Sequence, residues 1–194
     1  MTTRILTGDR TALAIESYVD EFIASRSQMG IGYFLIHAGG KRYGVEDPRA
    51  CAMGSSYSEV LSRLRREGEH VLTFASRIDA RDLAIHVVNH IYDRGFSEPV
   101  LPPEWKQEID ALLYANALIW APDGDAAFDD GSHVLQIDDG DKVRIIAFVN
   151  ADTQGELESS LADVTTERAR YYAVLREWAQ KFELQWMNSH IETA

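Results

Sequence analysis

A segment near the N-terminus predicts a β-hairpin, and this local pairing restricts the possible folds more than any other part of the sequence. Residues 30–37 are rich in aromatic and β-branched side chains, and residues 41–45 repeat that character after Gly39-Gly40. Glycine adopts the positive φ angles that a tight turn between antiparallel strands requires. Residues 30–45 are therefore predicted to form an antiparallel pair of strands.

Further strands are predicted on either side of this hairpin. The apolar run at residues 12–19 favours a strand, and a helix is the alternative. Residues 117–121 end at a proline and also favour a strand. A second hairpin joins residues 134–137 to 143–149, and Asp139-Gly140 suits its turn.

Three helices are predicted between the hairpins, at residues 56–67, 80–94 and 104–114. A capping box predicts the start of the first helix, because the Ser56 hydroxyl can accept from the Glu59 amide while the Glu59 carboxylate reaches back. Asp79 is predicted to cap the second helix, and Pro103 lies in the first turn of the third.

The C-terminal segment, about residues 161–187, predicts a long helix with an aromatic face. Its large side chains recur at three- and four-residue steps: Tyr171, Leu175, Trp178, Phe182 and Trp186. One such face can cover a sheet. The fold class predicted is therefore α+β, an antiparallel meandering sheet with helices packed on one face, in one domain spanning residues 1–194.

Charge and cysteine content exclude several classes of protein. The chain carries 31 acidic and 19 basic residues, a net charge of −12, which disfavours nucleic acid and anionic membranes as partners. Cys51 is the single cysteine, so the chain has no intramolecular disulfide and no cysteine-based zinc site. No apolar run approaches the roughly 20 residues of a membrane span, and no signal peptide is evident, so a cytoplasmic location is expected.

The most unusual feature is a concentration of acidic residues between 121 and 156. A calcium loop is excluded, because counting from Asp123 places Ala127 and Phe128 at positions that need a carboxylate and a glycine. Two interpretations stay open: solvated turns, or a negative surface for a basic partner protein. The predicted partner-binding residues are Trp120, Asp123, Asp125, Phe128, Asp129, Asp130, Asp138, Asp139 and Asp141, with Trp120 and Phe128 as candidate anchors.

Metal and catalytic motifs are incomplete. His86 and His90 have the four-residue spacing of a metal pair, but Val87 stands where a zinc protease has its glutamate, so structural histidines are favoured. No cofactor and no metal are expected. One enzyme alternative remains, in which His133 and nearby aspartates form an acid–base site for a small molecule.

Three parts of the chain resemble a known family. These are residues 8–16, residues 33–45 and the terminal pattern Tyr172-x5-Trp178-x3-Phe182-x3-Trp186. Together they resemble immunity protein family forty-two, which is associated with bacterial polymorphic toxins and contact-dependent inhibition. Residues 78–103 match no pattern of that family, and their role in recognition is open.

The resemblance implies a protein without catalytic residues that binds and blocks the toxic domain of one cognate effector in the producer's cytoplasm. A basic toxin such as a nuclease would suit the acidic surface. The remaining alternative is a structural module that self-associates through the aromatic helix, and a homodimer is compatible with either role.

Overall fold

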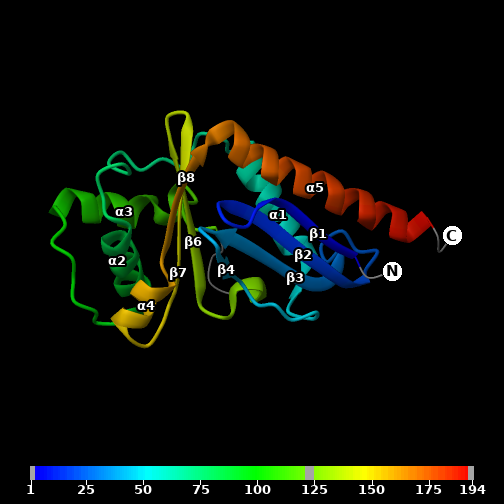
Figure 1. The fold of residues 1–194 in the computed structure, drawn as a ribbon, viewed down its shortest axis with the longest axis horizontal. Helices are drawn as coiled ribbons and strands as arrows, with labels where there is room; N and C mark the ends of the chain where they lie inside the picture. Colours follow the sequence, from blue (N-terminus) through cyan, green and yellow to red (C-terminus); the bar gives the residue numbers. More distant parts are fainter. Residues whose placement is uncertain (1–2, 121–124, 192–194) are drawn as a thin grey trace.

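The computed structural model describes residues 3–120 and 125–191, which form a chain of strands and helices arranged around two sheets (Figure 1). The elements follow in the order β1 (Thr3–Asp9), β2 (Leu13–Phe22), β3 (Gly30–Ala38), β4 (Lys41–Tyr43), β5 (Cys51–Ala52), α1 (Met53–Arg65), α2 (Ala80–Tyr92), α3 (Pro103–Ala115), the 3-10 helix η1 (Ala126–Phe128), β6 (Ser132–Asp139), β7 (Lys142–Val149), α4 (Gln154–Ser160), β8 (Ala162–Glu167) and α5 (Arg168–Ile191).

The first sheet contains the predicted N-terminal hairpin. Its strands are antiparallel in the order β1-β2-β3-β4, and β5 pairs with β3. Gly39 and Gly40 form the turn between β3 and β4 with φ angles of 59° and 79°, as the hairpin requires. The run at residues 12–19 is a strand, since it falls within β2.

The second sheet is the antiparallel meander β6-β7-β8. Asp139 pairs with Lys142, so Gly140 and Asp141 form the turn, one residue later than the predicted Asp139-Gly140. The strand predicted at residues 117–121 is reduced, within its described part, to a single bridge between Ile119 and Leu135.

The first helix begins earlier than predicted, and its predicted capping box is wrong. α1 starts at Met53, so Ser56 lies inside the helix and is buried. A tertiary contact replaces the side-chain cap: the Gly54 amide in the first turn donates to the Gln28 carbonyl at 2.7 Å. The predictions for α2 and α3 are confirmed, and the Asp79 carboxylate accepts a hydrogen bond from the Arg81 amide at 2.8 Å.

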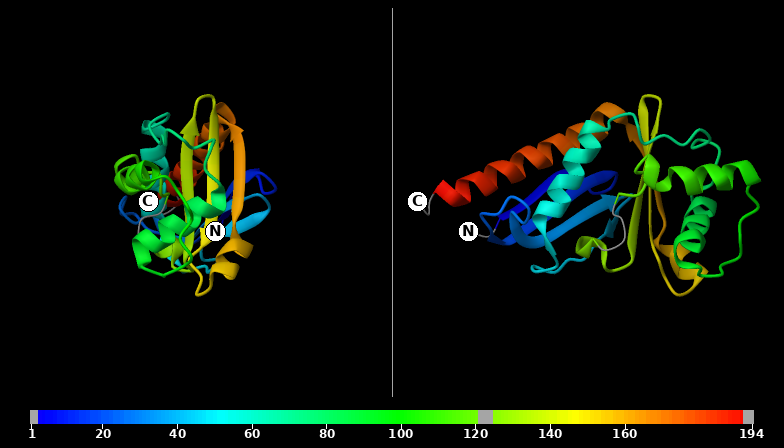
Figure 2. Two further views of the ribbon diagram at one scale, coloured as in Figure 1. Left: turned by 90° about the vertical axis from the view of Figure 1, so that its left-hand side faces the viewer. Right: turned by 180° about the vertical axis from the view of Figure 1, so that it is seen from behind.

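The predicted C-terminal helix is correct in its aromatic part and wrong at its start. Residues 162–167 form β8, which pairs with β7, and the helix α5 starts at Arg168. The aromatic face of α5 packs on β1, β2 and α1, where Trp178 and Phe182 are fully buried. α1 and α5 cover one face of the first sheet, as Figure 2 shows from behind.

The second sheet separates two hydrophobic cores because its strands bury both faces. Along β7, Val143, Ile145 and Ala147 belong to the core of the first sheet, α1 and α5. Ile146 and Phe148 point the other way, into a core formed with α2, α3 and α4. Figure 1 shows this sheet between the two groups of elements. The α+β class with antiparallel meanders is confirmed, and the strands form two sheets.

Membrane insertion of a helix finds no support in the described part of the chain. Within residues 3–120 and 125–191, no helix combines the length and the apolar character that a bilayer crossing demands.

Candidate functional site

The predicted acidic residues are divided between the two ends of β6. Asp129 and Asp130 are exposed just before the strand, whereas Asp139 and Asp141 are exposed at its far end. Eight residues of extended chain place these ends roughly 23 Å apart at about 3.3 Å per step. The acidic residues that are continuous in sequence therefore form two separate surfaces.

The η1 end carries the carboxylates of Asp125, Asp129 and Asp130. Asp125 caps η1 by accepting from the Ala127 amide at 3.0 Å, and burial raises the pKa of this carboxyl, with a smaller contribution from Asp129. Asp130 accepts from the Ser132 amide at 3.0 Å and keeps its side chain exposed. This end presents negative charge to solvent.

The tip of the β6–β7 turn mixes both signs of charge. A surface hollow of about 510 Å³ is lined there by Glu67, Asp141, Glu167 and Arg168. Arg176 forms an ion pair with Glu67 at 2.5 Å. Cations therefore offset much of the negative charge at this tip.

Three of the predicted contact residues lie in the interior. Trp120 and Phe128 are 2% and 7% exposed and belong to the core of the first sheet. Asp138 is 2% exposed, and its carboxylate accepts hydrogen bonds from the Gly68 amide at 2.8 Å and the Tyr172 hydroxyl at 3.0 Å. These three side chains are structural and are not part of the surface that a partner meets. Asp123 lies outside the described residues.

The helix-free face of the first sheet carries an ionic cluster that the sequence did not predict. Glu16 on β2 is 1% exposed and forms ion pairs with Arg4 and Arg10, while His37 on β3 contacts the same carboxylate at 3.0 Å. Burial raises the pKa of Glu16, but the hydrogen bonds from Arg10, Arg4 and His37 outweigh it and hold the pKa below its usual range. Burial lowers the pKa of His37, which favours its neutral form.

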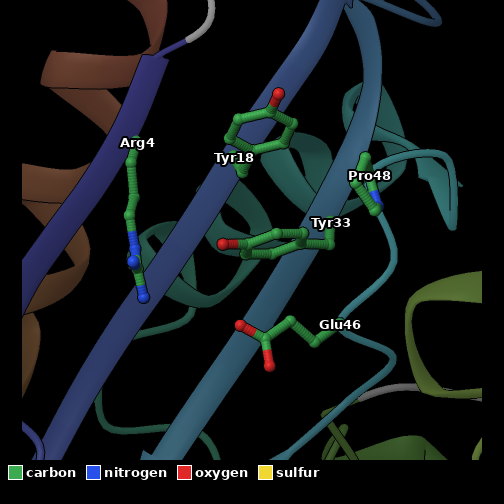
Figure 3. Close-up of a pocket in the computed structure, with 5 residues that line it drawn as sticks. All are labelled: Arg4, Tyr18, Tyr33, Glu46 and Pro48. Carbon is green, nitrogen blue, oxygen red and sulfur yellow. The ribbon is translucent and has the colours of Figure 1, made fainter.

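A pocket of about 470 Å³ lies beside this cluster (Figure 3). Arg4, Tyr18 and Tyr33 come from three adjacent strands, and Glu46 and Pro48 come from the segment after β4. The tyrosine rings stack with their centroids 5.5 Å apart. Cross-strand pairing of Arg4 with Tyr18 and of Tyr18 with Tyr33 brings these side chains together, a relation that the sequence does not reveal without the register.

The histidine and cysteine candidates have structural surroundings. His133 is 5% exposed, its ring nitrogens contact the Tyr92 hydroxyl at 2.8 Å and the Gly131 carbonyl at 2.9 Å, and its ring stacks on Phe148. Burial is the largest cause that raises the pKa of the Cys51 thiol to about 12, which makes it a poor nucleophile.

His86 and His90 share a carboxylate partner. His86 Nε2 lies 2.8 Å and His90 Nδ1 3.3 Å from an Asp110 oxygen, so α2 and α3 are joined at this point. Across the described part of the chain, no group of three or more His, Cys, Asp and Glu side chains is placed to hold a metal ion.

The aromatic face of α5 is used within the chain. Tyr171, Tyr172, Trp178 and Phe182 are each 0% exposed. The self-association predicted through this face would require these side chains to leave the core, so this face is not available to a second copy.

Comparison with known proteins gives a family and a fold. Residues 1–181 match the family model for immunity protein 42. The chain is also similar to the crystal structure of CdiI from Burkholderia dolosa, with a TM-score of 0.57 and 15% identity over 91% of this chain and 99% of that chain. No curated protein matches the chain. Because the family model covers nearly the whole sequence, the chain belongs to the immunity protein 42 family.

Proposed function

We propose that this chain neutralises the toxic domain of a cognate bacterial effector by forming a stoichiometric complex with it. The family match over residues 1–181 carries the proposal, and the fold shared with CdiI supports it. The protein converts no substrate in this role. It acts in the cytoplasm of the producing cell and its siblings, where it keeps the toxin from its target.

The η1 end of the molecule is the proposed contact for a basic toxin. Asp129 and Asp130 are exposed there, and the chain as a whole carries a net charge of −12. Long-range attraction speeds the encounter with a positively charged domain, and close carboxylate pairs then fix the register. A nuclease suits this surface because its substrate groove must attract phosphates.

The tip of the β6–β7 turn should contribute less than the η1 end to the attraction between this chain and the toxin. Asp139 lies opposite Lys142, the pair Glu67–Arg176 is internally compensated, and Arg168 lines the same hollow as Asp141. Compensated charges contribute little to steering. The two ends of β6 therefore provide a matched comparison.

Co-expression tests the proposal directly. Cells that produce the toxic domain encoded beside this protein should grow only when this chain is also produced, and a non-cognate immunity protein should not restore growth. Growth inhibition that persists despite the folded chain would refute the proposed function.

Charge reversal tests where the toxin binds. Replacing Asp129 and Asp130 with lysine should slow association with a catalytically inactive toxic domain at least about tenfold at low salt, and added salt should narrow the difference. The same double reversal at Asp139 and Asp141 should change the association rate by less than about threefold. Equal rates for both variants would remove the η1 end from the contact surface.

A further inference from the structure

We propose that the helix-free face of the first sheet, around Arg4 and Tyr18 with the buried Tyr33 ring as support, is a second part of the toxin contact, where Arg4 binds an aspartate or glutamate of the toxin. This inference rests on the proposed function. It adds a site of opposite charge to the acidic contact at η1.

The strand register sets this face apart from the core. Arg4, Tyr18 and Tyr33 are cross-strand neighbours on β1, β2 and β3. The alternate residues Ser17 and Phe34 face α5, where Trp178 donates a hydrogen bond to the Ser17 hydroxyl at 2.9 Å and its ring meets Phe34 at 5.0 Å. In Figure 3, α1 and α5 lie behind the sheet and the pocket side chains lie in front of it.

The side chains on this face have the character of a protein-binding surface. Tyrosine and arginine are enriched among the residues that dominate interface energies. Leu6 on β1 adds apolar surface, because 42% of it is exposed. Pro48 forms a further wall of the pocket and carries no charge. An apolar side chain of a partner can therefore pack beside a charged one.

The charge balance of the ionic cluster selects a carboxylate as ligand. Arg4 and Arg10 share the single carboxylate of Glu16, and the lowered pKa of His37 leaves the histidine neutral near pH 7. Glu46, which also lines the pocket, is ion-paired with Arg42, so one positive charge remains in excess among these groups. The Arg4 side chain is 54% exposed, so part of its planar set of donors stays open to a carboxylate from outside.

Glu16 also holds the site in place before binding. Its carboxylate is buried on the sheet and fixes the arginines from β1 and from the turn that follows it. A side chain that is already ordered loses less conformational entropy when it binds a partner. Arg4 is thus presented at a set position beside the stacked tyrosines.

The pocket is connected to the acidic contact through the segment after β4. Glu46 and Pro48 line the pocket, and the Val45 amide donates to the Ala127 carbonyl of η1 at 2.8 Å. One partner can therefore reach both places. A volume of about 470 Å³ suits one or two side chains rather than a whole helix.

Binding to the inactive toxic domain tests the inference. Arg4→Gln and Tyr18→Ala should each raise the dissociation constant at least about tenfold, the size of effect expected at a hot spot. Tyr18→Phe keeps the ring and should bind within about threefold of wild type. Arg65→Gln, on α1 behind the sheet, and Tyr114→Ala, an exposed tyrosine on α3, are matched controls that should leave affinity unchanged.

A second variant covers the case in which Arg4→Gln unfolds because Glu16 loses a partner. Arg4→Lys keeps the positive charge beside Glu16 and loses the planar fork, so it should fold and still bind at least about fivefold more weakly. Neutralising the acidic residues of the toxin in turn should reveal one whose effect on binding is smaller in the Arg4→Lys background than in wild type.

The possible results distinguish failure of the sheet-face contact from failure of the proposed toxin-neutralising function. If folded Arg4→Lys and Tyr18→Ala variants bind as tightly as wild type, the sheet face is not a contact. If binding weakens but no toxin carboxylate couples to Arg4, the assigned ligand is wrong. If the wild-type chain does not bind the toxin at all, the proposed function itself fails.

Discussion

The guanidinium carbon of Arg63 lies 4.5 Å from the centroid of the Trp120 ring, in the interior of the protein. Arg63 donates hydrogen bonds to the carbonyls of Ala117 and Ile119, at 3.2 Å and 2.5 Å, and to the Gln136 side chain at 3.0 Å. Trp120, which the sequence predicts in the contact surface, therefore packs over a buried arginine. The arginine connects α1 to the segment that precedes η1.

Replacing Arg63 with alanine should destabilise the protein by about 3–5 kcal/mol, because the Ile119 carbonyl loses this donor inside the core and the Gln136 amide oxygen keeps only the Tyr171 hydroxyl. Urea unfolding followed by circular dichroism measures the change. Arg65→Ala, an exposed position on the same helix, should shift the free energy of unfolding by less than about 0.5 kcal/mol. Similar losses for both variants would show that the buried contacts are not the cause.

Lowering the pH should destabilise the fold through His70. Its side chain is 0% exposed, and burial, followed by the nearby Arg63, lowers its pKa in the folded state. The unfolded chain then binds the proton more strongly, so stability is full above the unfolded pKa of about 6.5 and falls by up to about 1.4 kcal/mol per pH unit below it.

Free energies of unfolding between pH 5 and 8 check this prediction. The Nδ1 atom of His70 contacts the Asn116 carbonyl at 2.8 Å, and a His70→Gln variant can keep a donor there without taking up a charge. Its stability should vary less with pH than that of wild type. An unchanged slope would assign the acid sensitivity to other groups.

Gly32→Ala should disrupt the first sheet and the pocket on it. A β-carbon at this position would lie 1.9 Å from the Tyr18 carbonyl oxygen. That oxygen belongs to the backbone of the paired strand, so the clash can be relieved only by shifting one of the two strands. We expect a loss of several kcal/mol, on the order of the largest single-site effects. Gly155→Ala is the control, since open space surrounds that helical position and alanine should be neutral or stabilising by up to about 1 kcal/mol. Thermal unfolding distinguishes the two.

Trp178→Ala should cost about 3–5 kcal/mol, because it removes the centre of an aromatic cluster. The Trp178 ring stacks on Phe182 with centroids 5.2 Å apart and meets Phe34 edge-on. Leu184→Ala on the same helix removes a side chain that is 60% exposed and should have a small effect. Comparable unfolding midpoints for the two variants would contradict the packing argument.

Local signals explain which elements the sequence predicts correctly. The Gly39-Gly40 turn, the Asp79 cap and the aromatic spacing of α5 are each determined by residues within a few positions of one another. The sequence pattern does not separate β8 from the following helix, because β8 is six residues long and depends on pairing with β7. Tertiary packing decides such short segments.

The candidate site depends on contacts that span the chain. Acidic residues that are neighbours in sequence separate because β6 runs between them, and Asp138 turns inward on that strand. Arg4, Tyr18 and Tyr33 meet only after three strands have paired in register. Alternation along a strand indicates which of its side chains lie on the same face of the sheet. It does not indicate which other strands pair with that strand.

The strands β6 and β7 serve both hydrophobic cores at once, with Ile145 on one side and Ile146 on the other. Each core would become exposed to solvent if these strands separated. We therefore expect heat or denaturant to unfold both cores in a single cooperative transition. Probes at Trp105 and Trp178, one in each half, should then report the same midpoint. A destabilising substitution in α2 or α3 should therefore also destabilise the first sheet, although these helices pack in the other core.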